Sequence, residues 1–178
     1  MILSYSQSLL SRNDINRQSI TVAVTKHELN LPNTSIDLSN LFTISDAEKI
    51  LGEHAHITDS STIVKIDTLT YSAAYFANAK DAISGNTGSI YFFFEKYNRL
   101  SSAKNKYASI KKANEKHEGV KVLHNIGDEA YFHSDGENFY FIMVRKGKNV
   151  FNMKVNKITS KTSLSEFNQI AKNITNTL

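Results

Sequence analysis

The sequence predicts an α+β fold: a single domain with a mainly antiparallel sheet and two or three helices packed against it. Strand-like segments, in which apolar residues recur at a period of two, follow one another along the chain. Tight turns join most of them, and such turns require antiparallel pairing. Helical patterns that start at capping residues separate these runs. The 178 residues suit one domain that can bury a sizeable core.

The N-terminal 40 residues are expected to form an arm with one strand, and residues 41–178 the α+β domain. The strand is predicted at 18–27, where isoleucine and valine alternate with threonine and alanine. The following segment holds the only proline and is expected to be a loop.

The first helix of the domain is predicted at 44–52. Ser45 to Glu48 fits a capping box, in which the serine side chain accepts from an orphan amide and the glutamate reaches back to the cap. Gly52 is placed to end the helix in a left-handed conformation. The buried stripe would consist of Ala47, Ile50 and Leu51.

Strands are predicted next, at 62–78 and 89–97. The first segment holds two strand-like runs, which form either two strands or one long bent strand. The second, SIYFFFEKY, follows a turn at 85–88 and is apolar on both faces. We therefore expect it to be a central strand that is at least partly covered on both sides.

The longest helix is predicted at 99–117, before Gly119, with an apolar stripe on one side. That stripe would consist of Leu100, Ala103, Tyr107, Ile110 and Asn114. Four strands should follow, with turns at Gly127-Asp128, Asp135-Gly136 and Lys146-Gly147. A second capping box, Ser163 to Glu166, should start the last helix. Its buried stripe would be Leu164, Phe167, Ile170, Ala171 and Ile174.

Two segments are strongly basic. Residues 99–116 and 145–161 each carry six lysines or arginines, and the second has no acidic residue. They would suit a nucleic acid or another polyanion. However, the lysines of 99–116 spread around the whole solvent arc of a helix, and arginine, which nucleic-acid readers favour, is scarce. Solvation of the helix explains this spread better.

Other residue groups indicate no catalytic, cofactor-binding or metal site. His54 and His56 would point to one side of a strand, but no third ligand can be assigned and the chain has no cysteine. The acidic set Asp128, Glu129, Asp135 and Glu137 does not match a calcium loop, and turn or cap roles explain it better. The common nucleotide-binding and hydrolase motifs are missing, although a site assembled in space would leave no motif.

The aromatic hairpin at 139–156 predicts a partner or ligand face. A two-residue loop at Lys146-Gly147 would put Ile142 opposite Phe151, whereas a three-residue loop at 146–148 would put Met143 there. The three-residue loop gathers the larger side chains on one face and is preferred. The second face would then hold Tyr140, Ile142, Val144 and Val150. Either the N-terminal arm or a partner would cover it.

Some of these turns resemble a known class of proteins. Leu51 to Glu53, Gly127 to Tyr131 and Lys146-Gly147 are similar to motifs in small bacterial envelope lipoprotein domains of unknown function. The resemblance spans about residues 43–178. It implies an envelope location and a binding or structural role, and it supplies no catalytic residues. The lipid-bearing cysteine of such proteins is absent here.

Three functions follow as hypotheses. The leading one is a non-enzymatic envelope module that binds a protein or small ligand, without a cofactor. The alternatives are a cytoplasmic protein that binds a polyanion through 99–116 and 145–161, and an enzyme with a spatially assembled site. The N-terminus does not resemble a secretory signal, so the location is either cytoplasmic or an envelope or periplasm reached with a leader since removed. No transmembrane run is present, and an uncovered apolar sheet face would also allow a homodimer.

Overall fold

A computed structural model describes residues 37–178, which belong to a compact unit that spans Ile36–Leu178. The predicted strand at 18–27 lies outside the described residues. From 37 onward, the predicted order of helices and strands is confirmed. The elements are η1 (Leu38–Asn40), α1 (Ile44–Leu51), β1 (Ala55–Val64), β2 (Thr68–Ala77), β3 (Ser89–Tyr97), α2 (Leu100–Asn114), β4 (Val120–Leu123), β5 (Glu129–Ser134), β6 (Phe139–Lys146), β7 (Asn149–Asn156) and α3 (Leu164–Thr177).

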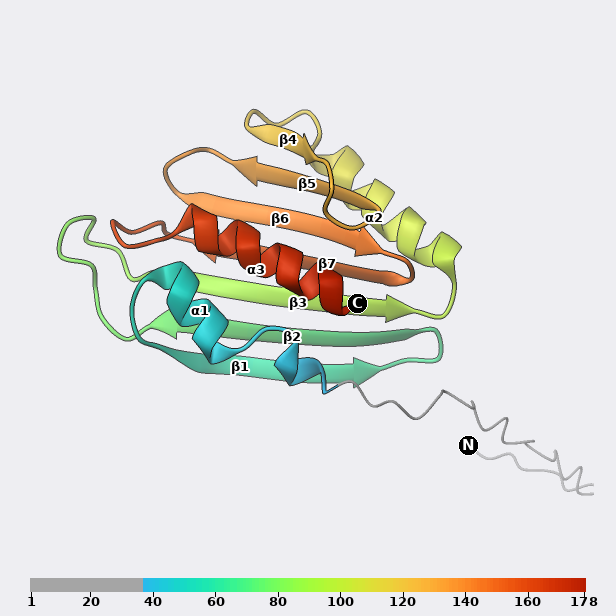
Figure 1. The fold of residues 1–178 in the computed structure, drawn as a ribbon, viewed down its shortest axis with the longest axis horizontal. Coiled ribbons are helices and arrows are strands. Elements are labelled where there is room, and N and C mark those ends of the chain that lie inside the picture. Colours follow the sequence, from blue (N-terminus) through green and yellow to red (C-terminus); the bar gives the residue numbers. More distant parts are fainter. Residues whose placement is uncertain (1–36) are drawn as a thin grey trace, which may run out of the picture. The chain divides into compact units, whose positions relative to one another are not determined.

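The seven strands form one antiparallel sheet in the order β1-β2-β3-β7-β6-β5-β4 (Figure 1). Strands that are consecutive in the sequence pair with each other, apart from β3 and β4. Instead, β3 pairs with β7. The predicted α+β class is therefore confirmed. The strand β3 is central, as expected, with β2 on one side and β7 on the other.

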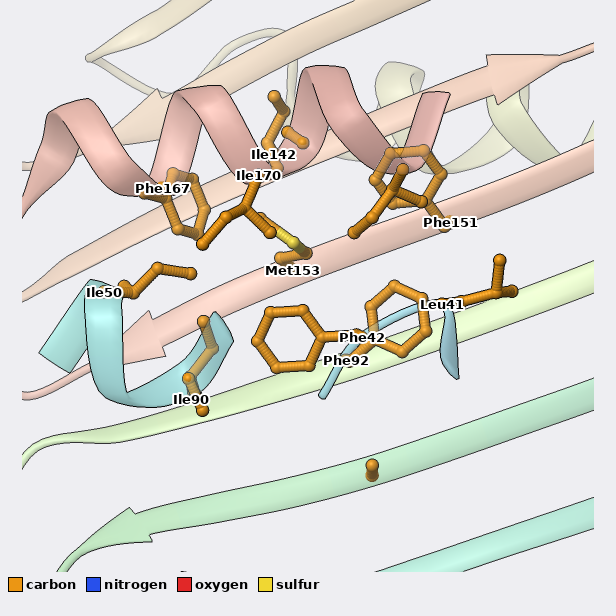
Figure 2. Packing of buried hydrophobic residues seen from close by; sticks show 14 of the residues in the cluster. Leu41, Phe42, Ile50, Ile90, Phe92, Ile142, Phe151, Met153, Phe167 and Ile170 are labelled. Atoms are coloured by element: carbon orange, nitrogen blue, oxygen red, sulfur yellow. The ribbon is translucent and has the colours of Figure 1, made fainter. Parts of the chain in front are cut away.

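Helices cover both faces of the sheet, but unequally. In Figure 1, α1 and α3 lie across one face, where they bury the main core. The second helix, α2, packs on the opposite face over a smaller core that includes Tyr107, Tyr131 and Met143. Figure 2 shows part of the main core, where the rings of Phe42 and Phe92 stack with centroids 5.2 Å apart.

The helix α1 ends at Gly52 as predicted, with a left-handed φ of 72°. Its predicted capping box was wrong by two residues. The side chain of Thr43 accepts from the amide of Asp46, and the Asp46 carboxylate accepts from the amide of Thr43 at 3.0 Å. Glu48 instead accepts from the amide of Ala55, across the turn that leads into β1.

The helix α3 starts at Ser163 as predicted, where the serine side chain accepts from the amide of Glu166. The reciprocal bond of the predicted capping box does not form. The amide of Ser163 donates instead to the carbonyl oxygen of Ile50, at 2.8 Å, and so joins α3 to the end of α1. The predicted stripe is buried apart from Leu164, which remains 38% exposed.

The segment predicted at 62–78 forms two strands rather than one. Lys65 and Thr68 close a hairpin, and β1 extends back to Ala55, well before the predicted start. In α2, Ala103 and Tyr107 are buried as predicted, whereas Leu100 is exposed.

Candidate functional site

The predicted partner face lies inside the structure. Tyr140, Ile142 and Val144 point to the side of the sheet covered by α1 and α3. Val150 points to the opposite side, beneath α2. Ile142, Val144 and Val150 are fully buried and Tyr140 is half-buried, so these four residues do not form an exposed surface together.

The β6–β7 hairpin explains this placement, because its register differs from both predicted alternatives. Lys146 pairs with Asn149, so Gly147 and Lys148 form a two-residue loop, and Val144 lies opposite Phe151. Gly147, the first loop residue, has a φ of 56°. A glycine with positive φ at this position is typical of a type II′ turn, which matches the twist of the flanking strands. The preferred loop at 146–148 was therefore wrong.

The apolar surface that remains accessible lies elsewhere on the sheet. The helix α2 buries side chains of β5, β6 and β7, and within residues 37–178 it leaves residues of β2, β3, β6 and β7 uncovered on its own side. We call this surface the open face. It consists of Ser72, Ala74, Phe76, Tyr91, Phe93, Phe139, Asn152 and Lys154. The register places Tyr91 between Ala74 and Lys154, and Phe93 between Ser72 and Asn152.

Aromatic rings dominate the open face. Phe76 and Tyr91 meet edge to face, with ring centroids 6.0 Å apart. The ammonium of Lys154 lies 5.5 Å from the ring centroid of Phe139, within the range of a cation–π interaction. His133 packs edge-on against the same phenylalanine at 4.9 Å. The rings therefore stabilise one another and hold defined orientations at the surface.

The border between the open face and α2 is polar. Lys106 of α2 forms an ion pair with Glu95 of β3, at 3.4 Å. Burial, and a hydrogen bond that its hydroxyl donates to the Glu95 carboxylate, raise the pKa of the neighbouring Tyr97 well above its usual range. This tyrosine therefore stays neutral and packs against the small core beneath α2.

The residues of the open face were only partly foreseen. The alternation along 89–97 correctly put Tyr91, Phe93 and Tyr97 on one side of the strand. It did not reveal that α2 covers Tyr97 and leaves Tyr91 39% exposed. That distinction depends on where a helix crosses the sheet, which the alternation of a single strand does not encode.

The basic segments lose part of their charge to ion pairs. In 99–116, Lys106 pairs with Glu95, and in 145–161, Lys161 pairs with Glu53 at 3.1 Å. Arg145, in the same segment, is only 4% exposed. The polyanion hypothesis therefore rests on fewer free charges than the sequence suggested.

Arg145 is held by Asp128, in the loop before β5, and by Glu129, the first residue of β5. Its guanidinium donates to Glu129 and, at 2.7 Å, to Asp128. Burial lowers the pKa of Arg145, but the two carboxylates outweigh this effect and raise it. The amide of Gly147 donates to Asp128, and this bond, helped by Arg145, lowers the pKa of the carboxyl. These hydrogen bonds connect the Gly127-Asp128 turn to the β6–β7 loop.

Asp135 has the predicted turn role. Its carboxylate accepts from the backbone amides of Asn138, at 2.8 Å, and of Glu137, at 3.1 Å. These bonds keep the pKa of Asp135 well below its usual range. Asp128, Glu129 and Asp135 therefore stabilise turns and an arginine.

His54 and His56 do not point to a shared site. Nδ1 of His54 lies 3.1 Å from the Glu48 carboxylate, and Nδ1 of His56 lies 2.6 Å from the side-chain oxygen of Asn78. Within residues 37–178, no three histidine, aspartate or glutamate side chains come close enough together to hold a metal ion.

A small cleft of about 270 Å³ lies between the β4–β5 loop, the end of β6 and the last turns of α3. Lys146 and Lys172 line it, together with Asn125 and Asn176. None of the residues that line this cleft belongs to the open face.

Comparison with known protein families, curated proteins and solved structures yielded no match to this chain. The resemblance to small envelope lipoprotein domains therefore stays a prediction. None of the helices in the described part of the chain is both long and apolar enough to span a membrane.

Proposed function

We propose that this chain is a non-enzymatic binding module that recognises a protein partner through the open face. The observation that carries the proposal is the exposure of Tyr91 beside the half-buried rings of Phe76 and Phe93. Clustered aromatic residues at a surface are typical of the centre of a protein interface, where they contribute much of the binding energy.

The surroundings of these rings support a protein as the partner. Ser72 and Asn152 flank Phe93 with polar groups, as in the polar rim of an interface. The rings stand on a sheet, whereas small ligands prefer concave sites. The described cleft is lined by other residues. A partner surface with an apolar centre and an acidic group near Lys154 would fit this arrangement.

Site-specific photo-crosslinking in the native cell tests the proposal. A photoreactive phenylalanine analogue replaces Tyr91 in one variant and Leu164 in a control. The control position is matched, because Leu164 is 38% exposed, Tyr91 is 39% exposed, and Leu164 lies on the helix that covers the opposite face. We expect one defined intermolecular adduct from position 91, identified by mass spectrometry, and none from position 164.

Equal adducts from both positions, or crosslinks from position 91 only to other residues of the same chain, would contradict the proposal. A crosslinked nucleic acid would favour the polyanion alternative instead. Binding of such a polyanion should weaken steeply with salt, which binding centred on apolar rings should not.

We further propose an envelope location, which rests on the resemblance of the turn motifs alone. Fractionation of the native cells with an antibody against the chain tests it separately from binding. Recovery with the envelope is the expected result, and recovery with the cytoplasm would contradict it.

A further inference from the structure

The two edges of the sheet differ strongly. At one edge, β4 has four residues and carries Lys121, features that discourage further pairing. At the other edge, β1 has ten residues, pairs with β2 alone in the described part of the chain, and is exposed beyond Ala55. Two of its large apolar side chains, Ile63 and Val64, are 49% and 75% exposed. A long strand of this kind is a template for another strand.

The backbone of β1 shows which groups are free. Lys65 and Thr68 exchange both of their backbone hydrogen bonds. In an antiparallel ladder such pairs alternate with non-bonded ones, so Ile63 and Ser61 also bond toward β2. The amides and carbonyls of Ser60, Thr62 and Val64 therefore point away from the sheet. A bulge between Ile57 and Asp59 limits the regular part of the strand to residues from Asp59 onward.

We propose that β1 pairs antiparallel with β1 of a second copy of this chain, about a two-fold axis that passes beside Thr62. In this register Thr62 faces its own counterpart, and Ser60 faces Val64 of the second copy. Every residue whose backbone groups point outward then meets another such residue. The two sheets join into one, with the α1 and α3 sides together, so residues of the same face remain aligned.

The side chains fit this register. Ile63 lies opposite Ser61 of the second copy, and Val64 opposite Ser60, so each large apolar side chain meets a small one. Asp59 lies opposite Lys65 of the second copy, and symmetry repeats this pair of opposite charges. Both residues are exposed, and neither forms a salt bridge within residues 37–178. Opposite charges directly across a strand pair stabilise it.

Neighbouring registers lose this complementarity. A slip of one residue would place side chains of the core side against those of the open-face side. Slips that move the two-fold axis to Ser61 or Ile63 put Asp59 opposite Ile63, or Lys65 opposite Ser61. The pairing centred on Thr62 is the one that matches backbone groups, faces and charges together.

The pairing goes beyond the proposed function and does not depend on it. The two-fold axis is perpendicular to the sheet, because both copies keep the same side. Both open faces would therefore lie on one side of the joined sheet. A partner with two binding sites could then engage the dimer at a higher effective concentration than a monomer.

Sedimentation velocity of the full 178-residue chain over a concentration series tests the inference. The wild type should show a reversible monomer–dimer equilibrium. In Lys65→Asp, the new aspartate of each copy lies opposite Asp59 of the other copy, so two repulsive pairs replace two attractive ones. The dimer dissociation constant should therefore rise at least about tenfold. The double variant Asp59→Lys/Lys65→Asp should restore dimerisation to within about threefold of the wild type. Lys121→Asp, on the opposite edge, should have no effect.

The charge swap distinguishes loss of the specific register from loss of folding. Both positions are exposed, so the substitutions should not unfold the chain, and circular dichroism checks the fold of each variant. A wild type that stays monomeric up to its highest soluble concentration would overturn the inference. So would a dimer whose dissociation constant does not change in Lys65→Asp, or a swap that fails to restore pairing.

Discussion

Tyr91 and Phe92 are neighbours on β3 whose side chains point to opposite sides of the sheet. Phe92 is 1% exposed in the main core, where it stacks on Phe42, and Tyr91 is 39% exposed on the open face. Two adjacent aromatic residues therefore have different roles. The packing of one maintains the fold, and the exposure of the other leaves it available to a partner.

This difference predicts unequal effects of truncation on stability. Phe92→Ala leaves a cavity in the main core beside Phe42 and should lower the free energy of unfolding by about 3–5 kcal/mol. Tyr91→Ser removes a ring that is partly solvated and should cost less than about 1 kcal/mol. Urea denaturation of both variants measures the two values. Similar losses would mean that the open face is buried in the protein in solution.

The backbone at Gly119, before β4, lies close to Ser134 at the end of β5, whereas Gly136 has open space around it. Both have left-handed backbones, with φ of 84° and 85°, but a Cβ at 119 would lie 1.9 Å from the carbonyl oxygen of Ser134, and a Cβ at 136 would meet nothing within 4 Å. Gly136→Ala should therefore cost about 1–2 kcal/mol, the strain of the conformation alone. Gly119→Ala should cost at least about 1 kcal/mol more. Equal costs in thermal unfolding would show that the α2–β4 connection relaxes freely.

Asp81 should make the free energy of unfolding depend on pH in the acidic range. Its carboxylate accepts from the side chain and amide of Ser84 and from the hydroxyl of Ser160, at 2.6 to 2.8 Å. These bonds hold the pKa of Asp81 far below the ordinary 3.8, and the bonds from Ser84 have the largest effect. The unfolded chain takes up the proton first, so this contribution is complete above the ordinary pKa and is lost as the pH falls below it.

The Asp81→Asn variant should consequently be less stable than the wild type at neutral pH. The difference should shrink as the pH falls through and below 3.8 toward the pKa of the folded state. Denaturation curves at a series of pH values measure it. A difference that stays constant across this range would exclude a role for the ionised carboxylate.

Tyr75 anchors the segment before α1. Its buried hydroxyl donates to the carbonyl oxygen of Phe42 at 3.0 Å, and burial raises its pKa to about 12. Tyr75→Phe leaves that carbonyl without this donor and should lower the free energy of unfolding by about 1–2 kcal/mol. Tyr91→Phe is the matched control and should leave stability nearly unchanged. The same loss in both variants would argue against a specific role for the Tyr75 hydrogen bond.

Local signals in the sequence predicted most of the fold from residue 37 onward. Gly52 marked a helix end because glycine adopts the left-handed conformation with little strain, and Ser163 marked a helix start because its side chain accepts from an orphan amide. The start of α1 at Ile44 agrees with the predicted range, but its capping box was misplaced because Thr43 to Asp46 and Ser45 to Glu48 both fit a capping pattern. Only the packing of the preceding segment distinguishes them.

Features that depend on distant parts of the chain were not predicted. The early part of β1 is an exposed edge, so it lacks the apolar alternation that reveals a half-buried strand. The register of the β6–β7 hairpin differs by one residue from the preferred prediction. This shift places Phe151 and Met153 opposite Val144 and Ile142, so the predicted face belongs to the main core. The open face itself arises where α2 stops covering the sheet, a relation between elements that are separate in the sequence.

The affinity of the partner for purified variants tests the central claim most directly. The protein crosslinked at position 91 would be produced and titrated, by calorimetry, against wild type, Tyr91→Ser and Leu164→Ser. Loss of a central aromatic contact should weaken binding at least about thirtyfold, since such residues contribute 2 kcal/mol or more. Leu164→Ser should bind as the wild type does. Unchanged affinity in Tyr91→Ser would contradict the claim that the open face is the binding site.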